Sequence, residues 1–339
     1  MERSVTHTRR RLIAAAAAAA LVAALFRDVL AALVMQLLAG YALMALALPL
    51  CRLLEKRLST GASAALSFLA LTGAALLVLV TLLPPLARQL RQLSEAAPAL
   101  LKWAGGVLND AQTMLSERGI DVSPARDELL ARVSAAAGSA VAYLAKAAGQ
   151  AARSAGKLFL APLIAFYLLK DRRKITSALT LVIPVSHRAR AVRAAREMRR
   201  ETASFLRGQL LISAVVGVMT AVGLLATGTP GWLVLGLLMG VLELIPYLGP
   251  VLAGIPAVLL ALQGGVARAL WTLGVILLVQ QLEGNLLSPR MLSGATRLHP
   301  LAVLLAISAG GMVGGTLGML LALPAVVSLR GALRGWRTG

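Results

Sequence analysis

Two carboxylates and a short run of polar side chains in the last third of the chain are its best candidates for chemistry. Glu243 stands inside the apolar run from Trp232 to Leu262, where a carboxylate costs several kcal/mol unless it is protonated, paired or facing water. Gln280 and Glu283 are three residues apart and share one helix face, with Asn285 nearby. Such side chains could bind a proton or a cation, or hydrogen-bond a hydroxylated solute.

Each of these residues also has a purely structural interpretation. Glu243 could only tie down a helix break by accepting backbone N–H groups, and Glu283 could form a salt bridge with Arg290. His299 titrates near neutral pH and could relay protons. A histidine directly before a proline at a helix start, here Pro300, is however more often a cap or an interface residue. Both interpretations stay open at this point.

Helix breakers must position these side chains. Pro246 and Pro250 interrupt the apolar run and free backbone carbonyls that could line a cavity. The two pieces that remain are each shorter than the roughly 20 residues of a full membrane span, so we expect a hairpin that need not cross completely. The remaining breakers in this region are Tyr247-Leu-Gly249 within the same interruption, Pro256 after it, and Pro289, which we expect to end the next helix.

A glycine-rich apolar segment follows in the last part of the chain, before the predicted tail. Its spacing of small residues is typical of close helix packing, with a hinge at the first glycine pair as the alternative. The residues concerned are Gly310, Gly311, Gly314, Gly315 and Gly318, followed by Pro324.

The composition sets the class of protein. Apolar residues make up 58% of the 339 residues and charged residues only 14%, and the mean hydropathy is +0.81. Soluble domains carry about one-quarter charged residues. We therefore predict an all-α, polytopic integral membrane protein with about eight transmembrane helices, broken or re-entrant hairpins and an amphipathic helical insert. The net charge of +20 resides beside apolar spans, which favours anionic lipid over nucleic acid as its partner.

The pattern of apolar runs and charges divides the chain. Arg9 to Arg11 and the alanine-rich run after them resemble a signal peptide, but a second apolar run follows at once and favours a transmembrane hairpin. We predict transmembrane helices in 1–86, an amphipathic insert in 87–154, a transmembrane helix in 155–169, a basic helical segment in 170–208, a transmembrane core in 209–329 and a tail in 330–339.

Charge bias orients these segments. Residues 170–207 contain eleven Lys or Arg against three acidic residues, which places them in the cytoplasm, together with both termini. The insert, with eight basic and six acidic residues between Arg88 and Arg153, is close to neutral and is placed outside.

Enzyme signatures are missing from the sequence. It has no His-Glu-x-x-His pair, no phosphate-binding glycine loop with Lys-Ser or Lys-Thr, and only three histidines, and the lone Cys51 has no partner for a disulfide or a thiolate metal site. We expect no catalytic residues, no metal and no cofactor.

The last hundred residues resemble a known family. The motifs are Glu243-Leu-Ile-Pro-Tyr-Leu-Gly-Pro250, Gln280-Gln-Leu-Glu-Gly-Asn285, His299-Pro300 and the glycines before Pro324. Together they are similar to the autoinducer-2 exporter (AI-2E) family, the PerM-like permeases, and the likeness extends over the whole chain. It implies a bacterial inner-membrane permease that forms homo-oligomers, with a pentamer as one option. Its substrates range from the quorum signal autoinducer-2 to sodium or lithium exchanged for protons.

Three functions follow as hypotheses. The first is export of a small polar solute, such as a quorum signal or related metabolite, from the cytoplasm. The second is exchange of a monovalent cation for protons, with Glu243 as the ligand. The third is a membrane scaffold or assembly protein that binds a partner through the external insert.

Overall fold

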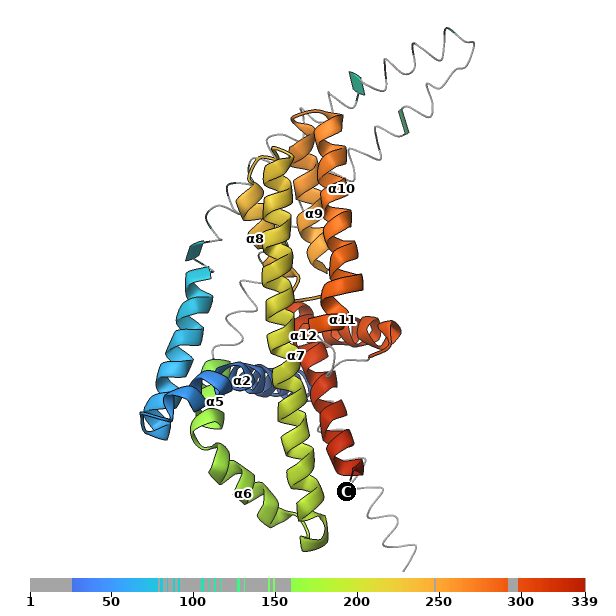
Figure 1. Ribbon diagram of the computed structural model, residues 1–339. Coiled ribbons are helices and arrows are strands. Elements are labelled where there is room, and N and C mark those ends of the chain that lie inside the picture. Colours follow the sequence, from blue (N-terminus) through green and yellow to red (C-terminus); the bar gives the residue numbers. More distant parts are fainter. Residues whose placement is uncertain are drawn as a thin grey trace, which may run out of the picture.

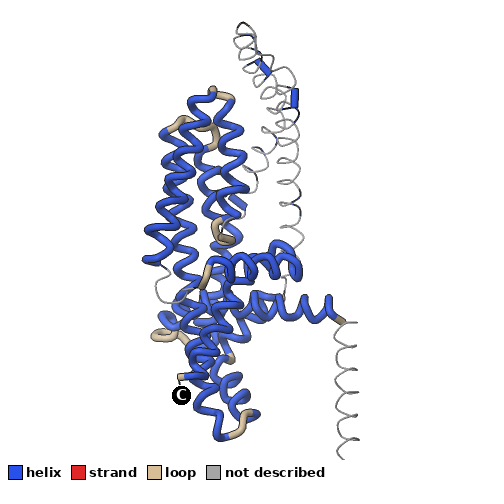
Figure 2. Tube along the Cα trace, turned by 90° about the vertical axis from the view of Figure 1, so that its right-hand side faces the viewer, coloured by secondary structure: helices blue, strands red, loops and turns tan. Residues whose placement is uncertain are grey.

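The computed structural model describes residues 26–78, 160–246, 248–291 and 298–338, with isolated positions between 80 and 149. Within these ranges the chain forms helices joined by turns, without strands (Figure 2). The predicted first span before residue 26 and most of the predicted insert lie outside the described residues. The helices are α2 (Arg27–Leu54), the helix Thr60–Val78, α5 (Ala161–Lys170), α6 (Arg172–Val182), α7 (Val185–Ala226), α8 (Trp232–Leu242), α9 (Leu248–Leu262), α10 (Val266–Leu282), the π-helix η1 (Glu283–Leu287), α11 (Ser288–Met291) and α12 (Pro300–Arg337).

Five stretches in the described part of the chain are long and apolar enough to cross a membrane: Val29–Leu54, Thr60–Val78, Val185–Ala226, Val266–Met291 and Pro300–Arg337. Three shorter apolar helices accompany them, Ala161–Lys170, Trp232–Leu242 and Gly249–Leu262. Large apolar side chains also cover much of the outer surface, as expected where lipid surrounds a protein. The prediction of an all-α, polytopic membrane protein is confirmed.

Helix α7 is the axis of the molecule (Figure 1). Its 42 residues span about 63 Å at 1.5 Å per residue, and they run without a break from the basic segment into the apolar span. Helix α8 packs against the C-terminal half of α7 at very short range, because a Cβ atom on Gly236 would lie 2.5 Å from that of Ala221. Small residues at such contacts let membrane helices approach closely.

The predicted glycine-rich segment is a helical hairpin. Helix α12 contains a non-helical residue, Gly315, with φ 59° and ψ −142°, a conformation open to glycine and strained for other residues. A Cβ atom on Gly310 would overlap the carbonyl oxygen of Gly318. Residues eight apart in a straight helix are about 12 Å apart, so 300–314 and 316–337 must fold back on each other.

The second half of this hairpin packs against the N-terminal half of α7 (Figure 1). A Cβ atom on Gly331 would lie 2.9 Å from the Cα of Met198, and one on Gly335 would lie 2.7 Å from the Cα of Ala194. The Thr202 and Ser328 hydroxyls also bond across this contact at 2.7 Å. The two helices therefore run antiparallel with their backbones nearly touching.

The predicted broken hairpin after α7 is present as α8 and α9, of 11 and 15 residues. Both fall short of a full span. Two of the predicted breakers behave differently. Pro256 lies inside α9, and the helix that contains Pro289 continues to Met291. Pro324 likewise lies inside α12. Membrane helices tolerate interior prolines because neighbouring groups and local π turns satisfy the freed backbone.

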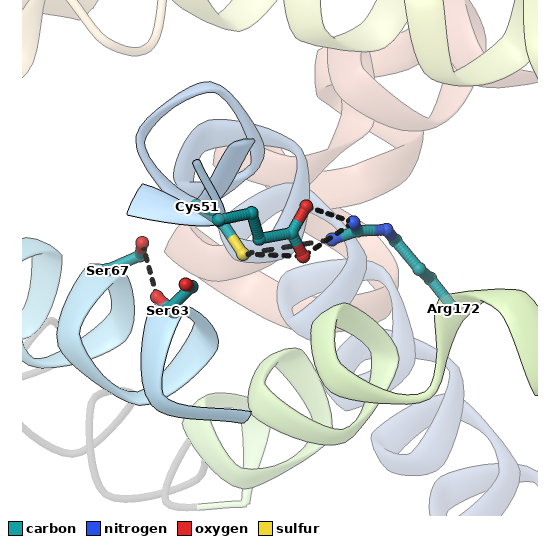
Figure 3. Close-up of polar contacts among 5 residues, drawn as sticks. Cys51, Ser63, Ser67 and Arg172 are labelled. Atoms are coloured by element: carbon teal, nitrogen blue, oxygen red, sulfur yellow. Dashed lines mark hydrogen bonds and ion pairs between the residues drawn. The ribbon is translucent and has the colours of Figure 1, made fainter. Parts of the chain in front are cut away.

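A polar clasp joins the end of α2 to the start of α6 (Figure 3). The Arg172 Nη2 atom donates to both carboxylate oxygens of Glu55, at 2.7 and 2.5 Å, and Nη1 contacts the Cys51 sulfur at 3.7 Å. Glu55 follows the apolar span, and the hydrogen bonds from Arg172 hold the pKa of its carboxyl below the usual 4.5. Cys51 is fully buried and serves as a packing residue.

Candidate functional site

The turn between α8 and α9 places Glu243 in the interior. Glu243 caps the C-terminus of α8 and is only 2% exposed. Its backbone carbonyl accepts a hydrogen bond from Gln209 Nε2 of α7 at 2.6 Å, which ties the turn to the central helix. The carboxylate oxygen Oε2 is buried and has no hydrogen-bond partner among the described residues. An unmet buried polar atom costs about 1–3 kcal/mol, so this atom is poised for a partner.

Gly249 makes the close packing at this turn possible. A Cβ atom on Gly249 would lie 2.8 Å from Glu243 Oε2 and 2.9 Å from the Glu243 nitrogen. The neighbouring Pro246 and Pro250 are half-buried, and Pro250 lies in the first turn of α9, where proline is well tolerated. Tyr247 lies outside the described residues. The motif thus serves to press the backbone of α9 against the carboxylate.

Helix α10 contributes further polar side chains next to Glu243. Gln280 lies beside the Glu243 carboxylate without a hydrogen bond of good geometry, and its Nε2 atom is buried without a partner in the described part of the chain. Glu283 is close enough for its charge to act on Glu243, and it accepts a hydrogen bond from Ser288. The π-helix η1 begins at Glu283. Single π turns within α-helices are frequent at functional sites.

A polar stripe on α7 was missed by the sequence analysis. It consists of Thr202, Gln209, Ser213, Thr220 and Thr227, at successive spacings of seven, four, seven and seven residues. These spacings keep all five on one face of the helix. The first four are nearly fully buried, and the hydroxyls of Ser213 and Thr220 have no partner among the described residues. The sequence did contain a signal for this stripe, namely polar residues that recur mostly every seven positions along the helix.

The stripe reaches from the basic half of α7 into its apolar half. Its 25-residue length corresponds to about 38 Å along the helix. At one end Thr202 bonds Ser328, and at the other Thr227 and Thr229 bond at 2.7 Å, as do Thr229 and Thr272. Gln209 bonds the Glu243 turn between these ends. The Glu243 turn therefore lies beside the stripe, between its two hydrogen-bonded ends.

Other predicted site residues lie elsewhere. Asn285 is exposed and donates to Gln281 at 2.9 Å, so it does not join the cluster with Gln280 that its spacing suggested. Residues five apart lie on different faces of a helix, whereas Gln281 and Asn285, four apart, lie on the same face. His299 is exposed, and its Nδ1 accepts from the Leu301 nitrogen at 3.3 Å as the cap of α12.

The remaining predicted residues are either exposed or part of the packing. Pro289 and Pro300 are exposed, and Gly314 packs against the side chain of Met35 in α2. Gly311 packs against Met319 within the hairpin. No group of three His, Cys, Asp or Glu side chains that could hold a metal ion occurs among the residues that the structure describes.

Several long apolar helices, a buried carboxylate at a broken hairpin and a polar stripe on α7 define a helical membrane protein of the transporter class. Comparison with known proteins gives the family. Residues 12–338 match the family model described as AI-2E family transporter, and the chain belongs to that family. It is a multi-pass membrane protein of a transporter family and not an enzyme, which confirms the resemblance drawn from the motifs.

Relatives support the same assignment. The chain is 29% identical over 282 residues to "Putative transport protein YueF" of Bacillus subtilis, which covers 81% of this chain and 76% of that protein. It is 34% identical over 169 residues to "Putative transport protein YrrI" of the same organism, covering 50% and 48%. It is 32% identical over 184 residues to "Putative permease PerM" of Escherichia coli, covering 54% and 52%.

Proposed function

We propose that this protein is a secondary permease that exports a small, hydroxylated solute along the α7 stripe, with Glu243 as the residue that contacts it. The observation that carries the proposal is the burial of Glu243 at 2% exposure with an unpartnered carboxylate oxygen. A membrane protein retains such a costly group where it has a task.

The free atoms of the site match a polar solute. Glu243 Oε2 is an acceptor, Gln280 Nε2 beside it is a donor, and the Ser213 hydroxyl on the α7 stripe can act as either; none of the three has a hydrogen bond of good geometry among the described residues. A molecule with two or three hydroxyl or carbonyl groups could satisfy them together. An apolar solute could not, because it would leave each of them buried and unmet.

The same geometry suggests what moves. The α8–α9 hairpin is held to α7 by glycine contacts, by the Gln209 hydrogen bond and by an apolar core in which Ile212 and Leu224 of α7 meet Leu235 of α8. Displacement of this hairpin would open the stripe to water and expose Glu243. Alternating exposure of one site by motion of a broken hairpin is a common mode of secondary transport.

Exchange of a monovalent cation for protons is the second candidate. It is favoured by Glu283, a second carboxylate that lies close enough to influence the charge of Glu243. Two carboxylates and the carbonyls of a broken helix are suitable oxygen ligands for a small cation. Oligomer formation, an inner-membrane location and cytoplasmic termini remain predictions under either candidate.

Flux into inside-out vesicles tests both candidates. Labelled autoinducer-2 and sodium would be supplied with and without a proton gradient, to wild type, to Glu243→Gln and to the exposed control Glu117→Gln. Solute entry that survives Glu243→Gln at reduced rate supports the permease, whereas collapse of sodium exchange in that variant alone supports the antiporter. Movement of neither by wild type would refute both and favour the scaffold hypothesis.

A further inference from the structure

A basic cavity lies between the N-terminal half of α7 and the end of α12. It has a volume of about 300 Å³ and is lined by Arg193, Arg196, Glu197, Arg334 and Thr338. A shallow hollow of about 480 Å³ adjoins it on the surface of α12 and shares Arg334 and Thr338. The other residues lining the hollow are Val326, Leu329, Arg330, Leu333 and Arg337. We call the two together the α7–α12 groove.

One end of the groove is suited to an anion. Its arginines come from both helices, and Arg193 Nε is buried without a hydrogen-bond partner in the described residues. Two carboxylates lie nearby and pair with arginines. Glu201 pairs with Arg334 of the groove at 2.8 Å, and Glu197 with Arg200 at 3.9 Å. Arg193, Arg196, Arg334 and Arg337 outnumber these two carboxylates, so this end is positive.

The arginines of α12 are also held in place by the helix. Arg334 and Arg337 occupy its last turn, where the carbonyl end of the helix dipole favours cations. The backbones of α7 and α12 nearly touch at Gly331 and Gly335, which fixes the distance between the arginines of the two helices. The basic end is therefore organised before any ligand arrives.

The other end of the groove is apolar. Leu329 is 61% exposed and Leu333 is 50% exposed, one helical turn apart, with Val326 beside them. These residues continue directly into the apolar span of α12, while the arginines follow towards the C-terminus. A groove that is apolar towards the membrane and basic beyond it has the polarity of a phospholipid.

We infer that the α7–α12 groove binds one anionic phospholipid, with the phosphate between Arg193, Arg196 and Arg334 and an acyl chain along Val326, Leu329 and Leu333. Arginine suits this role because its planar guanidinium binds phosphate oxygens in pairs. The cavity volume lies in the range of small-molecule sites. The lipid would join α7 to the hairpin that packs on it, at the level where the chain leaves the apolar layer.

Native mass spectrometry of the delipidated full chain tests this. Phosphatidylglycerol and phosphatidylcholine of equal chain length would be titrated into wild type, into Arg193→Gln/Arg196→Gln, and into the control Arg173→Gln/Arg190→Gln. The control removes the same charge from exposed arginines outside the groove. Circular dichroism and gel filtration would establish that each variant folds.

One tightly held phosphatidylglycerol is expected in wild type and in the control. The groove variant should bind it about 30-fold more weakly, because each arginine near an anionic headgroup contributes a factor of about five. Arg337→Gln, an exposed single change at the same end, should weaken binding about fivefold and covers the case in which the double variant misfolds.

Three results would overturn the inference. Equal affinity for phosphatidylcholine and phosphatidylglycerol would show that the groove binds lipid only through its apolar surface. An equal loss of phosphatidylglycerol affinity in the control and groove variants would show that the attraction is non-specific. Displacement of the lipid by millimolar inorganic phosphate, with no effect of Leu329→Ala on lipid binding, would identify a site for a soluble anion.

Discussion

Gly249 provides the sharpest test of how tightly the Glu243 turn is packed. A methyl group at this position would lie 2.8 Å from the Glu243 carboxylate oxygen and 2.9 Å from the Glu243 nitrogen. The carboxylate could rotate away, but the backbone nitrogen could not. Overpacking of this kind costs about 1–3 kcal/mol. The helix-favouring effect of alanine returns at most about 1 kcal/mol, so Gly249→Ala should destabilise the protein.

Gly254 is a matched control on the same helix. A Cβ atom there would lie 3.6 Å from the nearest atom, in the side chain of Ile276, which is an ordinary contact. Gly254→Ala should therefore leave the protein as stable as wild type or stabilise it by up to about 1 kcal/mol. The two variants add the same atoms to α9 and differ only in what those atoms meet.

The assay is thermal unfolding in detergent, followed by flux in proteoliposomes. Gly249→Ala should lower the midpoint of unfolding relative to Gly254→Ala and reduce flux, because the displaced carboxylate changes the site. If Gly249→Ala unfolds at the same temperature as Gly254→Ala and transports normally, the packing of α9 against Glu243 is not as described.

Three further predictions concern the elements around the site. Gly315→Ala should destabilise the α12 hairpin by about 1–3 kcal/mol, because Gly315 has a backbone conformation that is strained for alanine. The control Gly274→Ala, in open space on α10, should leave the stability unchanged. Equal unfolding midpoints for the two variants would contradict the hairpin turn. Gln209→Leu should lower the free energy of unfolding by about 1–3 kcal/mol, because the buried Glu243 carbonyl loses its hydrogen bond. The control Gln281→Leu, at an exposed position, should change it little. The reverse order would refute the hydrogen bond between α7 and the turn. The pKa of Glu55 is lowered in the folded state, so its contribution to stability is present above about pH 4.5 and is lost as the pH falls further. The stability of Glu55→Gln should therefore depend less on pH in this range. A pH profile of stability identical to that of wild type would contradict the clasp.

The sequence predicted the features that depend on composition and on local breaks. Apolar share and charge gave a polytopic helical protein, and Pro246 with Pro250 predicted the interruption between α8 and α9. The unusual position of Glu243 in an apolar run was enough to single it out. These signals are local, so they could be recognised without knowing which helices touch.

Features that depend on contacts between helices could not be predicted. The tie from Gln209 to the Glu243 turn joins residues 34 positions apart, and nothing in the sequence pairs them. The π turn at Glu283 could not be predicted either, because a π turn has no reliable sequence signature. Gly315 stood among four other glycines, and only the backbone angles identify it as the turn.

Access of water to the α7 stripe during transport is the central claim, and cysteine labelling measures it most directly. Ser213→Cys, in a Cys51→Ala background, would be treated in oriented vesicles with a membrane-impermeant thiol reagent, at rest and under a solute or ion gradient. Ala253→Cys is the control, since Ala253 is equally buried but belongs to the apolar core on α9. The account predicts that the gradient accelerates labelling at position 213 and not at 253. Labelling at 213 that stays as slow as at 253 under every gradient would contradict it.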